Sequence, residues 1–159
     1  MAWPAKFISG ANGAFSRYYR DPEATAATIL PDGWVRTGDR GKIDTNGHLL
    51  FLGRIKDMMK VGGENVGAVE IEAFLQTIPE VQLAQVVGIA DERLGEVPIA
   101  FIECRVGTNL TEADVIGACD GHLAKWKIPR RVIFMTEWPM SSTKVQKFRL
   151  KDLLETQQA

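Results

Sequence analysis

An α+β fold is predicted by three features of this 159-residue sequence. Beyond residue 54, runs rich in β-branched residues alternate with segments whose apolar residues recur at helical spacing. Before residue 54 the chain is rich in turn residues and has little helical patterning. The composition, with 45% hydrophobic and 25% charged residues, is typical of globular proteins. We therefore expect a compact α+β domain of roughly 100 residues after a β-rich segment.

The first part of the chain predicts strands and one short helix. Residues 1–20 have no periodic pattern, so we expect a loop or short strands there. Asp21 followed by proline predicts a helix over 21–28, because aspartate caps a helix and proline suits its first turn. Trp34 to Thr37 is expected to be extended, with the strand ending at Gly38-Asp39.

A hairpin is indicated by Asn46-Gly47, which lies between two apolar runs. A second hairpin is expected over 58–66, turning at Gly62-Gly63. Three strands and three helices complete the pattern. The strands are expected at 81–89, 97–106 and 131–135, and the helices at 68–76, 111–125 and 148–155. The prediction is a three-stranded sheet with flanking helices plus a β-hairpin.

Charge and cysteine content exclude several functional classes. Nineteen Lys and Arg against twenty Asp and Glu give a formal charge of −1, which offers no general attraction for nucleic acid or anionic lipid. No apolar run approaches the roughly 18 residues of a membrane span. The first residues lack the apolar core of a secretory signal, so a cytoplasmic setting is expected. Cys104 and Cys119 form no metal motif and are expected to be free thiols, and no metal site is predicted.

Asp39 and Arg54 are candidate ligand-binding residues because each follows a predicted strand. A fixed carboxylate at a strand end suits two vicinal hydroxyls, as on a ribose. The alternative is a turn aspartate that bonds its own backbone, and spacing alone favours this alternative. Arg54 can bind the same sugar or a phosphate, and a surface ion pair with Asp57 is an equal alternative.

Glycines and lysines supply the remaining candidates. Gly62-Gly63 lets a thin ligand run along bare backbone, although a plain hairpin turn explains the pair as well. Lys56 and Lys60 are more often solvated surface charges. Lys144 follows three hydroxyl residues in a loop, from which a lysine can deliver charge to a phosphoryl transition state. A basic surface loop is the more common reading of such a segment.

The order of these motifs resembles that of the AMP-forming acyl-CoA synthetases, a family of adenylate-forming enzymes. The motifs in chain order are Asp32-Gly33-Trp34, Thr37-Gly38-Asp39, Asn46-Gly47, Gly53-Arg54-Ile55-Lys56-Asp57, Val61-Gly62-Gly63-Glu64-Asn65, Val69-Glu70-Ile71-Glu72, Pro139 and Lys144-Val145-Gln146-Lys147. The Gly-Gly-Glu-Asn segment and the Lys-Val-Gln-Lys ending look more like fatty or aryl acid–CoA ligases than like peptide-synthetase adenylation domains. The sequence departs from the family's usual pattern at Arg40 and at Thr143.

The resemblance implies a two-step reaction in which an acid and ATP form acyl-AMP and CoA then displaces AMP. ATP, accompanied by Mg, and CoA would be the co-substrates, and a carboxylic acid, with fatty acids favoured, the substrate. By position, Asp39 would bind the ribose hydroxyls of ATP and Arg54 would assist. Lys56 would be a hinge between domains, and Lys144 the catalytic lysine of adenylation. Gly62 and Gly63 would line the pantetheine path, with Lys60 facing the active site in the second step.

The same resemblance implies an incomplete enzyme. Residues 1–53 would be the end of a large AMP-binding domain, 54–57 the hinge, and 58–159 a small C-terminal domain. The family's phosphate loop, adenine pocket and acyl pocket have no counterpart in the sequence, so the chain alone is expected to be inactive and to need a separate large domain. The alternative is a non-enzymatic product of truncation or a split gene, or a module that binds CoA or a partner.

Overall fold

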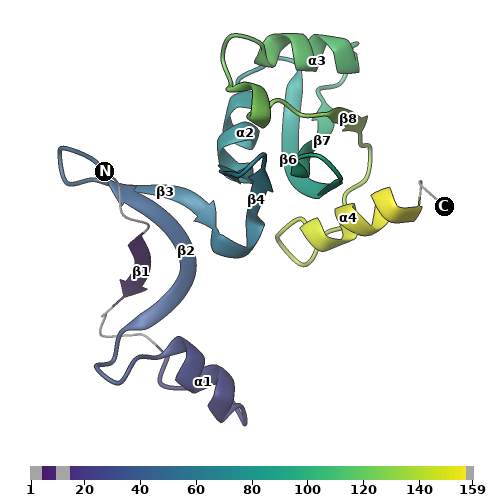
Figure 1. Cartoon of the computed structure of the whole chain (residues 1–159). Coiled ribbons are helices and arrows are strands. Elements are labelled where there is room, and N and C mark those ends of the chain that lie inside the picture. The colour runs from purple at the N-terminus through teal and green to yellow at the C-terminus, as the bar shows by residue number, and fades with distance from the viewer. Residues whose placement is uncertain (1–4, 10–14, 157–159) are drawn as a thin grey trace. The chain divides into compact units, whose positions relative to one another are not determined.

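A computed structural model describes residues 5–9 and 15–156 of the chain (Figure 1). The loop or short strands predicted over residues 1–20 include residues 1–4 and 10–14, which lie outside the described residues. The chain divides into two compact units, Met1–Lys56 and Asp57–Ala159.

The first unit is a three-stranded antiparallel sheet in the order β1-β2-β3, accompanied by helix α1. Its elements are β1 (Ala5–Ser9), α1 (Pro22–Thr28), β2 (Val35–Ile43) and β3 (Leu49–Arg54). The predicted cap of α1 is present, because the carboxylate of Asp21 accepts a hydrogen bond of 2.8 Å from the N–H of Ala24.

The predicted end of a strand at Gly38-Asp39 is wrong, because β2 continues to Ile43. The pairing with β1 shifts register where Arg36 lies opposite Ile8 and Arg40 opposite Lys6, so β2 has extra residues there. Gly38 has a φ of 75°, which a glycine adopts without strain. The glycine therefore accommodates a bulge inside a continuous strand, and Asp39 lies within that strand.

The second unit is a five-stranded sheet covered by helices, which confirms the α+β class. The strands follow the order β5-β4-β7-β6, and β8 pairs in parallel with β7. Its elements are β4 (Met58–Val61), β5 (Glu64–Gly67), α2 (Ala68–Leu75), β6 (Val81–Asp91), β7 (Gly95–Cys104), α3 (Glu112–Cys119), β8 (Arg131–Phe134) and α4 (Lys147–Thr156). The predicted hairpin is β4–β5, and it joins the sheet where Val61 pairs with Gly95.

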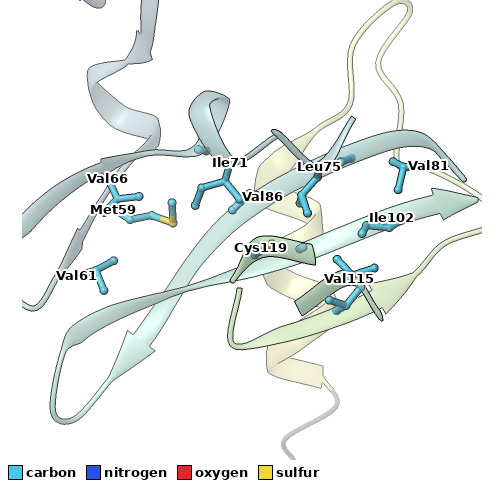
Figure 2. Packing of buried hydrophobic residues seen from close by; sticks show 14 residues of the cluster. Met59, Val61, Val66, Ile71, Leu75, Val81, Val86, Ile102, Val115 and Cys119 are labelled. Carbon is cyan, nitrogen blue, oxygen red and sulfur yellow. The ribbon is translucent and has the colours of Figure 1, made fainter. Parts of the chain in front are cut away.

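Two apolar clusters lie on opposite faces of this sheet, as the alternation along β6 requires. Val86 belongs to the larger cluster, in which side chains of β4, β5, α2 and α3 meet (Figure 2). Its neighbour Val87 belongs to the smaller cluster, with Leu150 and Leu154 of α4. Helix α4 therefore covers one face, and α2 and α3 cover the other. Both cysteines are free, and Cys119 is buried in the larger cluster.

Helix α3 is shorter than the predicted 111–125, because it ends at Cys119. Thr111 and Asp114 form the capping box at its start. At its end, Asp120 has an extended backbone and Gly121 has a φ of 75°. These two conformations cannot continue a helix, and a short 3-10 turn at Lys125–Lys127 follows instead.

Candidate functional site

Strands β2 and β3 bring Asp39 and Arg54 together as directly paired residues. The Oδ1 of Asp39 lies 3.6 Å from the Nε of Arg54, and their side chains are 27% and 52% exposed. The N–H of Asp39 donates to the Oγ1 of Thr37, so the local turn is closed by the threonine. The aspartate carboxylate is thus left to its arginine partner and to solvent. A partly exposed carboxylate and guanidinium on one face of a sheet can together bind hydroxyl and phosphate groups.

Lys56 lies in the short 3-10 segment Ile55–Asp57, which connects β3 to β4. Its side chain is exposed. The first compact unit ends at this lysine, and the second begins at Asp57. Rotation about a few backbone bonds in such a connection is how hinges work.

A pocket of about 470 Å³ lies beside the β4–β5 hairpin. It is lined by Lys60, Gly62 and Gly63 of the hairpin and by Arg93, Leu94, Gly95 and Glu96 from the turn between β6 and β7. Gly62 and Gly63 have φ values of 59° and 90°, which glycine adopts without the strain that a side chain adds. The N–H of Gly62 donates to the carbonyl of Leu94 over 2.7 Å, which joins the two turns.

Both cationic and anionic side chains line the pocket. Two exposed cations, Lys60 and Arg93, lie on its lining, while the Oε2 of Glu96 accepts a 2.7 Å hydrogen bond from the N–H of Lys60. Hydrogen bonds from the N–H groups of Leu94 and then Arg93 lower the pKa of Asp91 from its usual value. The ionised Asp91 thereby fixes the turn that carries Arg93. Such a pocket suits a thin ligand with anionic groups.

Lys144 lies at the exposed tip of the loop between β8 and α4. Its carbonyl accepts a 2.8 Å hydrogen bond from the N–H of Ser141, and Met140 and Val145 form an isolated β-bridge below it. The N–H of Gln146 donates to the carbonyl of Pro139 over 2.8 Å. The loop is therefore a narrow, hydrogen-bonded turn that presents an ammonium group to solvent.

The structure brings some of the predicted site residues together and separates others. Asp39 pairs with Arg54 in the first unit, and Lys60, Gly62 and Gly63 share the pocket in the second. Lys144 does not line that pocket. Sequence reasoning missed Arg93 and Glu96, which lie between the strands predicted at 81–89 and 97–106. An arginine and a glutamate beside Gly95 were the available signal, but no spacing rule relates them to the hairpin.

Residues 5–9 and 15–156 contain neither a cluster of metal ligands nor a helix that could span a membrane. No group of three or more His, Cys, Asp or Glu side chains in those ranges is arranged to hold a metal ion. No helix in the same ranges has both the length and the apolar character needed to cross a membrane.

A hairpin joined to a helix-covered sheet is an α+β arrangement consistent with the C-terminal domain of adenylate-forming enzymes. Residues 70–145 match the family described as the AMP-binding enzyme C-terminal domain. The part of the chain over residues 70–145 belongs to this family.

The relatives of the chain are acyl-CoA ligases and synthetases. It is 40% identical over 139 residues to a medium-chain acyl-CoA ligase of Bos taurus, ACSF2, whose name includes the word mitochondrial; the match covers 87% of this chain and 23% of the relative. It is 41% identical over 136 residues to the putative acyl-CoA synthetase YngI of Bacillus subtilis, covering 85% of this chain and 25% of that one. The chain thus spans about a quarter of the length of these relatives.

Solved structures of MatB from Rhodopseudomonas palustris match the chain closely. The ATP-bound form matches with a TM-score of 0.81 and 38% identity, covering 89% of this chain and 28% of MatB. The apo form matches over the same shares with a TM-score of 0.68 and 39% identity.

Proposed function

We propose that the chain is the C-terminal part of an ATP-dependent acid–CoA ligase. In the first step, an oxygen of the acid's carboxylate attacks the α-phosphorus of ATP, and the bond to pyrophosphate breaks to leave acyl-AMP. In the second step, the CoA thiolate attacks the acyl carbonyl, and the bond to AMP breaks to leave acyl-CoA. The observation that carries this proposal is the AMP-binding enzyme C-terminal domain over residues 70–145, which includes the exposed Lys144.

We assign the catalytic role in adenylation to Lys144. Negative charge builds up on the phosphate oxygens as the carboxylate attacks, and an ammonium group placed there lowers the barrier. The hydrogen-bonded loop holds the lysine backbone while its side chain extends into solvent, which suits a group that must enter a site on another domain. Asp39 and Arg54 are proposed to hold the ribose of ATP through its two hydroxyls.

The hairpin pocket is proposed to receive the pantetheine arm of CoA in the second step. Gly62 and Gly63 leave the backbone bare along a thin ligand, and Lys60 and Arg93 offer cations for its phosphates. Lys56 is proposed as the hinge that lets the second unit serve both steps with different faces. The boundary between the two units lies next to Lys56, which supports this assignment.

A fatty acid is the proposed substrate class, since ACSF2 is named as a medium-chain acyl-CoA ligase. The chain alone is proposed to be inactive, because it spans about a quarter of its relatives and residues for the acyl pocket would lie in the remainder. A separate large domain would then be its partner. The cytoplasmic setting stays a prediction that fractionation of the source cells can test.

The test uses an assembled ligase, in which this chain replaces the matching C-terminal region of YngI. ATP–pyrophosphate exchange is measured with a panel of fatty and aryl acids. Lys144→Ala is expected to slow the exchange about 10²–10³-fold, the effect of removing one transition-state donor. Lys125→Ala, which removes another exposed lysine of the second unit, should leave the exchange unchanged. Full exchange in the Lys144→Ala ligase would show that Lys144 is not the catalytic lysine.

The pocket also favours a second candidate function, a CoA-binding module without catalysis of its own. Isothermal titration calorimetry of the 159-residue chain with CoA, together with the activity of the assembled ligase, distinguishes this module from the proposed ligase. Binding of CoA that weakens in Lys60→Ala, together with an inactive assembled ligase, would favour the module. ATP-dependent CoA ligation by the chain alone would overturn the proposed need for a large domain.

A further inference from the structure

Glu72 on α2 is a buried carboxylate that connects two distant parts of the second unit. Its side chain is only 10% exposed, and its Oε1 lies 2.5 Å from the Nζ of Lys147, the first residue of α4. The same oxygen accepts a 2.8 Å hydrogen bond from the backbone N–H of Val86 in β6. One carboxylate oxygen therefore binds a strand and the start of a helix that lies 75 positions further along the chain.

The position of β6 explains how these groups can meet. Within the part of the chain that the structure describes, β6 is the last strand of the sheet and pairs only with β7, so its outer N–H groups have no neighbouring strand to bond. Helices α2 and α4 pack on opposite faces of the sheet, on either side of β6 in Figure 1. The Glu72–Lys147 pair therefore passes around the edge of the sheet and links one helical layer to the other.

Apolar packing alone leaves the start of α4 undefined. Leu150 and Leu154 bury the helix against the sheet, but apolar contact is not directional and lets a helix slide or turn. An ion pair with a short, directed hydrogen bond fixes the position of the helix's first residue. Lys147 is that residue, and it lies nearer to the loop than either leucine.

The loop that carries Lys144 is held at both of its ends. At its start, the Nε1 of Trp138 donates to the Oε2 of Glu103 over 2.6 Å. At its finish, Lys147 is held by Glu72 only three residues after Lys144, a separation of at most about 11 Å along the chain. The position of Lys147 therefore limits the positions that Lys144 can reach.

We propose that the Glu72–Lys147 pair is a positioning device that sets the place of Lys144 during adenylation. Both residues act through the loop and touch no substrate. The inference rests on the proposed role of Lys144. A pair that only stabilised the fold would raise the stability of the whole unit without a specific effect on the loop or on one step of the reaction.

The first test measures backbone hydrogen exchange in the 159-residue chain. The double variant Glu72→Gln with Lys147→Met removes both charges and keeps an acceptor for Val86, so no charge is left buried alone. The N–H of Gln146 is expected to exchange at least about 10-fold faster, while the N–H of Gly62, bonded to Leu94 beside the β4–β5 hairpin, exchanges as before. Lys147→Arg should keep the slow exchange, and Lys151→Met serves as the matched control on α4. Equal acceleration at both amides, or none at either, would overturn the proposal.

The second test measures the two steps separately in the assembled ligase. The double variant is expected to lower the kcat of ATP–pyrophosphate exchange about 10–100-fold with unchanged KM for ATP and acid, since small misplacements of a catalytic group have effects of this size. Transfer of supplied acyl-AMP to CoA should be unchanged, and Lys147→Arg should restore exchange. If Lys144→Ala stops exchange but the double variant does not slow it, the positioning role is wrong and the proposed function stands. If Lys144→Ala has no effect, the proposed function fails, and with it the catalytic part of this inference.

Discussion

Asp39 and Arg54 face one another across the β2–β3 pair, with 3.6 Å between the carboxylate Oδ1 and the guanidinium Nε. Neither residue is buried, and the arginine side chain is more than half exposed. Exposed ion pairs contribute little to stability, because both charges are well solvated when apart. The pair is therefore expected to contribute little to the stability of the sheet, which is compatible with the proposed binding role.

Asp39→Asn should separate these two explanations. We expect the free energy of unfolding of the chain to change by less than about 1 kcal/mol, as for other exposed pairs. In the assembled ligase, the KM for ATP should rise by about 10-fold or more, because a charged acceptor for the ribose hydroxyls is lost. Urea denaturation and steady-state kinetics measure the two effects. Glu23→Gln, an exposed carboxylate of the same unit, should change neither quantity, and a large loss of stability with unchanged KM would mark the pair as structural.

Gly63→Ala should destabilise the chain, whereas Gly117→Ala should stabilise it. Gly63 has a φ of 90°, where an alanine is strained, so a loss of about 1–2 kcal/mol is expected. Gly117 lies inside α3 with open space where the Cβ of an alanine would lie. Alanine should therefore raise the free energy of unfolding by about 1 kcal/mol, because its helix propensity is higher than that of glycine. Urea denaturation of both variants measures the pair of shifts. Opposite signs are the expected result, and equal signs would contradict the backbone conformations described.

The turn beside the pocket should depend on pH through Asp91. Because hydrogen bonds from Leu94 and Arg93 lower its pKa in the folded chain, the ionised form stabilises the turn. This contribution is complete above the unfolded-state pKa of about 4 and is lost as the pH falls through the lower folded value. NMR titration of the Leu94 amide between about pH 6 and pH 2 should follow this loss, with a midpoint below that of a free aspartate. In Asp91→Ala the transition should be absent, and a midpoint at or above the ordinary value would contradict the hydrogen bonds.

Much of the fold follows from local patterns in the sequence. The cap at Asp21, the hairpin at Gly62-Gly63 and the β-branched strand at 81–89 each depend on residues close together in the chain, and each is present. Two predictions failed at positions where a glycine is compatible with more than one local structure. Gly38 was expected to end a strand and instead makes a bulge. Helix α3 ends at Cys119, just before Gly121 and six residues before the predicted end at Lys125. Local pattern does not distinguish a glycine that bends an element from one that ends it.

In the candidate site, too, some features could be predicted from the sequence and others required the structure. Motif order identified Asp39, Arg54, Lys60 and Lys144 as candidates, and their functional roles remain predictions. Sequence reasoning predicted that Arg54 either binds a sugar or phosphate or forms an ion pair with Asp57. The ion pair that forms is with Asp39, because strand register brings these two residues opposite one another. The pairing of β4 with β7 likewise brings Arg93 to the hairpin, although the two lie about thirty positions apart.

By itself, the sequence determined the α+β class, the capped helices, the hairpins and the order of motifs, because each depends on neighbouring residues whose backbone preferences are intrinsic. Only the tertiary structure decided that Glu72 meets Lys147 around the edge of β6. A buried carboxylate requires partners, and three-dimensional packing alone selects which distant groups come within hydrogen-bonding distance of it. The sequence placed a lysine at 144, and the fold decided what holds the loop that carries it.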